Sequence, residues 1–205
     1  MFILNIVHDK LQIDKGFDVL KKPSAYDLTQ IALSTALLAV ASIVVLPIGV
    51  IPITLQVFFF LFIPALLGPV KGLMTIILYI IMGLIGLPVF AGGSGGIGSI
   101  LSPSFGYIIG ALIVAWIVGR GLLNQRSKLQ TLGIMSMGLG ALYVIGMTYQ
   151  YMIMTYFLQT PISFMSIMSV NFSVFLPIDM LKMILAVGLY GRLVKLPFAK
   201  RIDKL

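Results

Sequence analysis

Two ionisable side chains, Asp179 and Lys182, lie within an otherwise apolar stretch from Phe172 to Tyr190. A spacing of three residues puts both on one face of a helix, within reach of each other. A carboxylate accepts hydrogen bonds and an ammonium donates them, so the pair suits a ligand that carries both a carboxylate and hydrogen-bond donors. The alternative is a structural ion pair that fastens this segment to its neighbours.

Other chemistry is scarce in this chain. There is no cysteine, and the single histidine, His8, lies near the N-terminus. One acid–base pair could transfer protons, but no second carboxylate and no histidine fall within an apolar stretch. No glycine-rich segment ending in Gly-Lys-Ser/Thr occurs, so the chain has no phosphate-binding loop of its own. We therefore expect no enzyme activity, no metal site, no cofactor and no ATPase within this polypeptide.

The elements that position Asp179 and Lys182 are membrane helices. Of the 205 residues, 60% are hydrophobic and only 10% are charged, whereas soluble domains carry about 25% charged residues. A spanning helix needs about 20 mostly apolar residues. The sequence predicts an all-α, polytopic membrane protein with six transmembrane helices. These are residues 28–46, 55–67, 72–90, 105–118, 132–158 and 172–190.

We expect two regions in the chain. Residues 1–24 alternate apolar side chains with lysine and aspartate, which is typical of an amphipathic helix at the membrane surface or of a flexible tail. Residues 25–205 form the six-helix transmembrane domain.

The basic residues predict the orientation. If the N-terminus is cytoplasmic, 13 of the 14 lysines and arginines fall on the cytoplasmic side, and Lys182 is the exception. The three loops on the other side contain no lysine or arginine, as the positive-inside rule requires. Both termini are then cytoplasmic, and the net charge of +8 reflects topology in the cell membrane rather than nucleic-acid binding.

Polar and flexible residues gather at the outer ends of the predicted helices. The first outer loop ends with Thr54 and Gln56, and the second contains five glycines between Gly92 and Gly98. Glycines let backbone N–H and C=O groups approach a ligand closely. With Asp179 in the outer half of the last helix, the sequence predicts a site that captures a ligand from outside the cell.

Small residues repeat every four positions in two predicted helices. Ala32 and Ala36 lie in the first, and Gly106 and Gly110 in the fourth. Such spacing lets helices approach closely in lipid. It indicates either packing within the chain or a docking surface for another membrane subunit.

Several segments, in order, resemble the BioY family, the biotin-specific substrate-binding components of energy-coupling-factor transporters. The resemblance runs from about Ile31 to Lys195 and rests mainly on two motifs, Gly-Leu-Pro-Val-Phe-Ala-Gly-Gly-Ser-Gly-Gly at 86–96 and Pro-Ile-Asp-Met-Leu-Lys at 177–182. It differs from the family pattern at Ser102, Ser104, Phe105 and Ile178, next to the expected site.

The resemblance implies biotin as the transported substrate, captured for ATP-driven import. It also implies a transmembrane coupling subunit, which docks on Ala32 and Ala36, and two ATPase subunits. Lys182 is then the partner expected for the biotin carboxylate, and Asp179 either accepts from the ureido group or orients Lys182. The expected ligand-binding residues are Asp179, Lys182, Gln56, Thr54, Phe90, Gly92, Gly93, Ser94, Gly95, Gly96, Tyr107, Tyr79 and Tyr143.

Other functions stay open on the sequence alone. One is the same architecture bound to another vitamin or to a biotin precursor. Another is a stand-alone biotin facilitator that needs no ATPase. A purely structural membrane subunit is disfavoured because the polar residues converge on one face.

Overall fold

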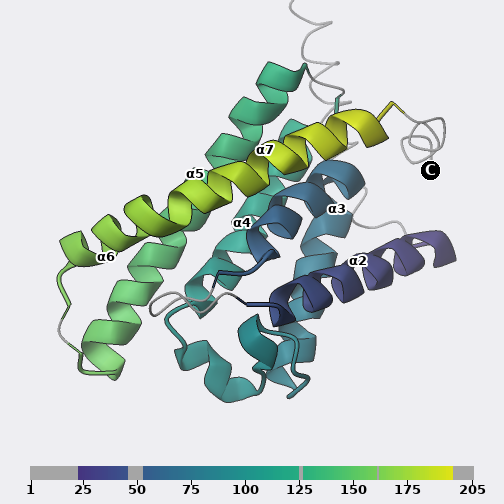
Figure 1. Ribbon diagram of the computed structural model, residues 1–205. Helices are drawn as coiled ribbons and strands as arrows, with labels where there is room; N and C mark the ends of the chain where they lie inside the picture. The colour runs from purple at the N-terminus through teal and green to yellow at the C-terminus, as the bar shows by residue number, and fades with distance from the viewer. Residues whose placement is uncertain (1–22, 46–52, 125–126, 161, 196–205) are drawn as a thin grey trace, which may run out of the picture.

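The computed structural model describes residues 23–45, 53–124, 127–160 and 162–195, and these are helices joined by turns and loops, without a β-strand (Figure 1). The predicted amphipathic or flexible segment, apart from its last two residues, lies outside this range, as does His8. The α-helices are α2 (Ala25–Ile43), α3 (Gln56–Leu84), α4 (Phe105–Gly121), α5 (Lys128–Met152), α6 (Phe164–Val170) and α7 (Leu176–Leu193).

Within the described residues, four helical segments are long and apolar enough to cross a membrane. They are Ala25–Ile43, Gln56–Leu84, Lys128–Phe157 and Phe164–Leu193, and the shorter α4 is also apolar. The predicted all-helical membrane class is therefore confirmed.

Serine residues cap the starts of α2 and α5 through reciprocal hydrogen bonds. Ser24 accepts a hydrogen bond from the backbone N–H of Asp27, whose carboxylate accepts in return from the backbone N–H of Ser24. Ser127 and Gln130 form the same reciprocal cap at the start of α5. Each cap satisfies N–H groups that a helix start leaves without a partner, and each is typically worth about 1 kcal/mol.

Helix α3 reverses direction at Gly68. This glycine has φ +81° and ψ 179°, which no helical residue adopts, and Pro69 restarts the helix with its φ already suitable. A Cβ added at Gly72 would lie 2.7 Å from Cβ of Pro64, so the two halves touch just beyond the turn. Farther from the turn, Gln56 in the first half bonds to Tyr79 in the second, so the halves, 56–67 and 69–84, form a helical hairpin.

The helix boundaries differ most from the predicted ones in the third and last spans, and by about three or four residues at the first and fifth. The third predicted span was expected to reach Phe90, but the helix ends at Leu84, because Gly86 adopts φ +107° and Pro88 follows. The last span begins at Phe164, eight residues before the predicted start. Ser163 caps α6, and a π-helical turn, η5 (Asn171–Phe175), then joins α6 to α7 without a break.

The core lies where α3, α4, α5 and α7 pack together, and α2 packs on the α3 hairpin. Gly106 and Gly110 of α4 lie against Tyr149 and Leu142 of α5. For this small-residue pair, packing within the chain is therefore the correct interpretation. In Figure 1, α6 and α7 run as one long tilted rod in front of α5.

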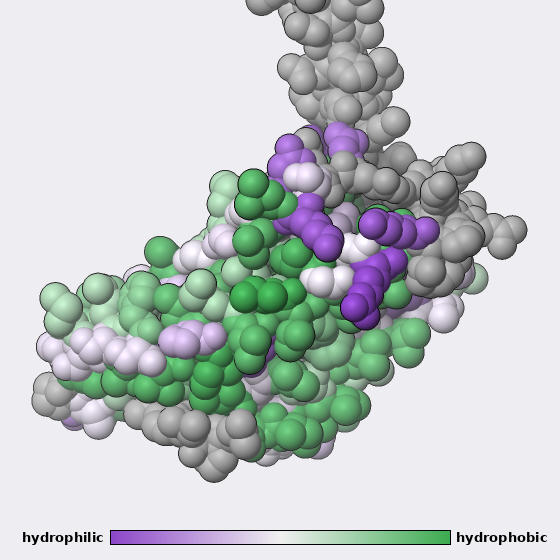
Figure 2. Space-filling model, turned by 45° about the horizontal axis from the view of Figure 1, so that its top comes forward, coloured by the Kyte–Doolittle hydropathy of each residue, from purple (hydrophilic) through white to green (hydrophobic). Residues whose placement is uncertain are grey.

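The surface divides sharply by polarity. Figure 2 shows a broad apolar face with hydrophilic side chains gathered near one end. Apart from the buried Lys182, the basic residues in the described part of the chain lie near the α3 turn (Lys71), the end of α4 (Arg120), the start of α5 (Lys128) and the end of α7 (Arg192 and Lys195).

Candidate ligand-binding site

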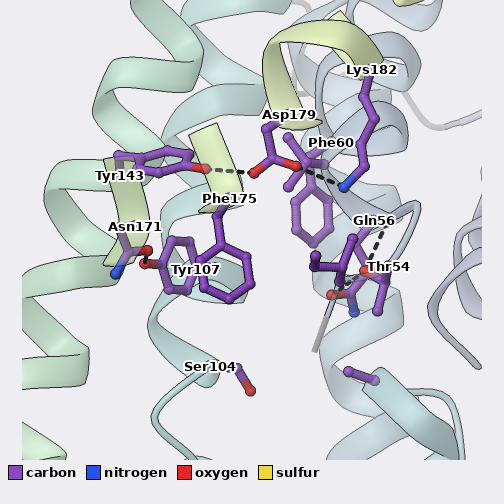
Figure 3. A pocket seen from close by; sticks show the side chains of 13 residues that line it. Thr54, Gln56, Phe60, Ser104, Tyr107, Tyr143, Asn171, Phe175, Asp179 and Lys182 are labelled. Carbon is purple, nitrogen blue, oxygen red and sulfur yellow. Dashed lines mark hydrogen bonds and ion pairs between the residues drawn. The ribbon is translucent and has the colours of Figure 1, made fainter. Parts of the chain in front are cut away.

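A pocket opens between the helices at the level of Asp179 and Lys182 (Figure 3). Its empty space, the open mouth included, is about 490 Å³. Its lining residues are Ile53, Thr54, Gln56, Val57, Phe60, Ala91, Ser104, Tyr107, Tyr143, Asn171, Phe175, Asp179 and Lys182. Segments far apart in sequence therefore supply a wall that combines apolar side chains with polar and charged ones.

Asp179 and Lys182 form a buried ion pair on one side of this pocket. The Nζ of Lys182 lies 2.7 Å from Oδ1 of Asp179, and the two residues are 8% and 7% exposed. The hydroxyl of Tyr143 donates to the other carboxylate oxygen at 2.7 Å. The Lys182 ammonium makes one of its three donor bonds to Asp179. The cluster is therefore neutral overall and lies beside the space that a ligand would occupy.

The π-helical turn aligns the pocket residues of the last helix. Ile167, Asn171, Phe175 and Asp179 are each four residues apart, and all four are buried. An α-helix has 3.6 residues per turn, so this spacing would drift around it. A π turn takes more residues per turn and offsets the drift. Asn171, Phe175 and Asp179 consequently line the same pocket.

Asn171 is a pocket residue that the sequence analysis missed. It is 1% exposed, and its side-chain oxygen accepts from the Tyr107 hydroxyl at 2.6 Å. Its amide N–H groups donate to Oε1 of Gln150 at 3.1 Å and to the backbone carbonyl of Ile167. The available signal was a lone asparagine in an apolar segment, eight residues before Asp179. This network holds the Tyr107 ring, which packs edge-to-face on Tyr143.

Thr54 and Gln56 lie on the pocket wall, as predicted. The Thr54 hydroxyl donates to Oε1 of Gln56 at 3.2 Å and accepts from the Gln56 backbone N–H. The amide nitrogen of Gln56 donates to the Tyr79 hydroxyl at 2.6 Å. Figure 3 shows these two side chains together on the wall below Lys182.

The structure does not bring every predicted site residue to the pocket. Tyr79 is fully buried behind Gln56, and Phe90 packs edge-to-face between Tyr79 and Phe105. In the glycine-rich loop, Ala91 lines the pocket. The loop residues outside the lining are Gly92, Gly93, Ser94, Gly95 and Gly96. Contact of a ligand with Tyr79, with Phe90 or with these five loop residues stays a prediction.

The predicted docking residues lie on the outward face of α2. Ala32 and Ala36 are exposed, whereas the neighbouring small residues Thr35 and Ala39 are buried against the rest of the protein. The two alanines therefore take no part in packing α2 onto its own chain.

Fold and site together define a multi-pass protein of the cell membrane with a polar pocket among its helices. The model of the BioY family matches residues 14–197. The chain belongs to the BioY family.

Relatives and one solved structure agree with this membership. The chain is 43% identical over 122 residues to the probable biotin transporter BioY of Pyrococcus horikoshii, covering 60% of this chain and 72% of the relative. It is 30% identical over 169 residues to the biotin transporter BioY of Thermotoga maritima, covering 82% and 96%. A crystal structure of the S-component for biotin from an ECF-type ABC transporter matches with a TM-score of 0.74 at 30% identity, covering 83% of this chain and 92% of that one.

Proposed function

We propose that this chain is the substrate-binding component of a biotin uptake transporter. It captures biotin from outside the cell for ATP-driven import by a separate energy-coupling module. The observation that carries the proposal is the Asp179–Lys182–Tyr143 cluster, which lies on the wall of a pocket between the helices. The likeness to biotin transporters and to the solved S-component for biotin supports it.

The neutrality of the cluster favours one orientation of biotin. A carboxylate at Lys182 would add a net negative charge to a buried site, which is costly. The ureido group is uncharged and offers two N–H donors and one carbonyl acceptor, which match Asp179 and Lys182. We therefore place the ureido ring at the ion pair and the carboxylate toward Ser104, which lies at the far side of the pocket in Figure 3. This reverses the arrangement expected from the resemblance.

The transmembrane arrangement that we propose has six crossings with both termini in the cytoplasm. The α3 hairpin counts as two crossings because its halves run antiparallel. The basic residues at the α3 turn, the end of α4 and the start of α5 then lie together on the cytoplasmic side.

The proposed partners are a transmembrane coupling subunit and two ATPase subunits. The exposed alanines Ala32 and Ala36 give a smooth strip on α2 where another helix can approach closely. Membrane lipid covers the remaining apolar surface.

Calorimetry with the detergent-purified chain tests the binding function. We expect biotin to bind the unmodified chain, and Lys182→Met to weaken binding roughly 10- to 100-fold, as loss of a hydrogen bond to a charged group does. The matched control is Lys71→Met, which removes a lysine paired with Asp27 at 2.5 Å, away from the pocket. Absence of biotin binding by a folded sample would refute the proposal.

The carboxamide of biotin tests the orientation. With the ureido ring at the ion pair, Lys182→Met should weaken binding of biotin and of its amide by the same factor. A lysine that pairs with the carboxylate would instead make the variant selective, weakening biotin much more than the amide.

Cysteine labelling tests the crossings. Because the chain has no cysteine, a single introduced thiol is unique. Ile97→Cys in the glycine-rich region and Leu129→Cys at the start of α5 replace side chains that are 76% and 78% exposed. In intact cells, a membrane-impermeant maleimide should label the first variant and not the second. The opposite pattern would invert the proposed orientation.

A further inference from the structure

A chain of hydrogen bonds leads from the pocket wall to helix α2. The amide nitrogen of Gln56 donates to the Tyr79 hydroxyl at 2.6 Å, which donates to Oγ of Ser42 at 3.0 Å. Ser42 in turn donates to the backbone carbonyl of Leu38 at 2.7 Å. Tyr79 and Ser42 are fully buried, and neither lines the pocket. The pocket and the buried face of α2 are thus joined without any contact between α2 and the ligand space.

The backbone carbonyl of Leu38 determines which group donates and which accepts in every hydrogen bond of this series. A backbone carbonyl can only accept a hydrogen bond, so the Ser42 hydroxyl donates its hydrogen to the Leu38 carbonyl. The Ser42 oxygen then accepts the hydrogen bond from the Tyr79 hydroxyl. Because the Tyr79 hydrogen is used in the bond to Ser42, the Tyr79 oxygen can only accept a hydrogen bond from Gln56. Only the NH₂ end of the Gln56 amide can donate that bond. The amide oxygen consequently faces the Thr54 hydroxyl, as observed.

We infer that Ser42 and Tyr79 are positioning residues that fix the orientation of the Gln56 amide in the binding site. The inference rests on the proposed function, in which Gln56 contacts biotin. With this orientation fixed, Gln56 presents one remaining N–H and one remaining oxygen lone pair to the pocket at set positions. An amide free to flip would exchange its donor and acceptor, and it would have to be ordered each time a ligand binds.

The structure also explains why a serine on α2 affects the pocket. Without the Ser42 hydroxyl, the Tyr79 O–H loses its acceptor on α2. It can then donate to Gln56 instead, which requires the amide to turn over. Ser42 therefore acts through Tyr79 and Gln56, although its own side chain is remote from the lining.

Ser42→Ala tests the inference, with Thr35→Val as its matched control. Both residues lie on α2, both are at most 1% exposed, and both hydroxyls donate to the carbonyl four residues earlier. Only Ser42 bonds to Tyr79. We expect Ser42→Ala to weaken biotin binding in calorimetry about three- to tenfold, the usual effect of one hydrogen bond, and Thr35→Val to change it less than twofold. Tyr79→Phe should weaken binding at least as much as Ser42→Ala.

A double-variant cycle separates positioning from a general loss of structure. In a Gln56→Ala background, Ser42→Ala should no longer change biotin affinity, because the residue through which it acts is gone. A full effect of Ser42→Ala in that background, or an effect no larger than that of Thr35→Val in the native background, would overturn the inference.

Melting temperatures without ligand give an independent readout. The side chains of Ser42 and Gln56 are joined by hydrogen bonds through Tyr79, so their alanine variants should be non-additive in melting temperature. If the unmodified chain fails to bind biotin, the proposed function fails while this cycle still decides the inference. Additive melting shifts would then refute it.

Discussion

Removal of the buried ion pair separates its contribution to folding from its contribution to binding. Two variants are needed. Lys182→Met keeps an apolar side chain of similar length but leaves Asp179 without its cation. The double variant Asp179→Asn/Lys182→Met removes both charges and keeps an acceptor for the Tyr143 hydroxyl.

The magnitude follows from the geometry of the pair. At 2.7 Å, two unit charges attract by about 6 kcal/mol when the effective dielectric constant is about 20. The hydrogen bond from Tyr143 stabilises the remaining carboxylate in part, so we expect Lys182→Met to lower the free energy of unfolding by about 3–5 kcal/mol. The double variant buries no charge and should return to within about 1 kcal/mol of the native chain.

Unfolding in detergent and biotin calorimetry measure the two contributions on the same samples. The expected pattern is that the double variant regains stability, while both variants have lost biotin affinity. Regained binding in the double variant would show that the pair serves only the fold. Native stability of Lys182→Met would refute the estimate of the ion-pair energy.

Two further predictions concern the packing of the α3 hairpin and the hydrogen bond between Tyr107 and Asn171. Gly72→Ala places a Cβ 2.7 Å from Cβ of Pro64 and should destabilise the α3 hairpin by about 1–3 kcal/mol in thermal unfolding. Gly133→Ala, on α5 with open space around it, should be neutral or stabilising by up to about 1 kcal/mol, and equal effects of the two would contradict the hairpin contact. Asn171→Leu leaves the partly buried Tyr107 hydroxyl without its acceptor and should cost about 1–2 kcal/mol. Unchanged unfolding of Asn171→Leu would show that water replaces the amide.

The sequence predicted features that depend on neighbours along one helix. Apolar stretches of sufficient length identified the helical membrane class, and a spacing of three residues predicted contact between Asp179 and Lys182, which is confirmed. The limits of the third and last spans were less accurate. A glycine with positive φ ended one helix early, and a π-helical turn extended another, and neither has a strong signature in hydropathy alone.

Contacts between distant segments were decided by the tertiary structure. Tyr143 meets Asp179 across 36 residues of sequence, and Tyr107 meets Asn171 across 64. Tyr79 was expected on the pocket wall because it is aromatic and lies in a membrane helix. Close packing in the hairpin instead turns its ring behind Gln56, where its hydroxyl bonds to Ser42.

The physical reason for this division is the range of the interactions. Burial of apolar side chains in lipid and contacts within one helical turn are local properties, so composition and spacing alone determine them. The pocket depends on how α3, α5 and α7 pack around each other and on which buried donor finds which acceptor. Those pairings arise only when the helices are assembled, and they decide which of many polar residues in the chain face the ligand space.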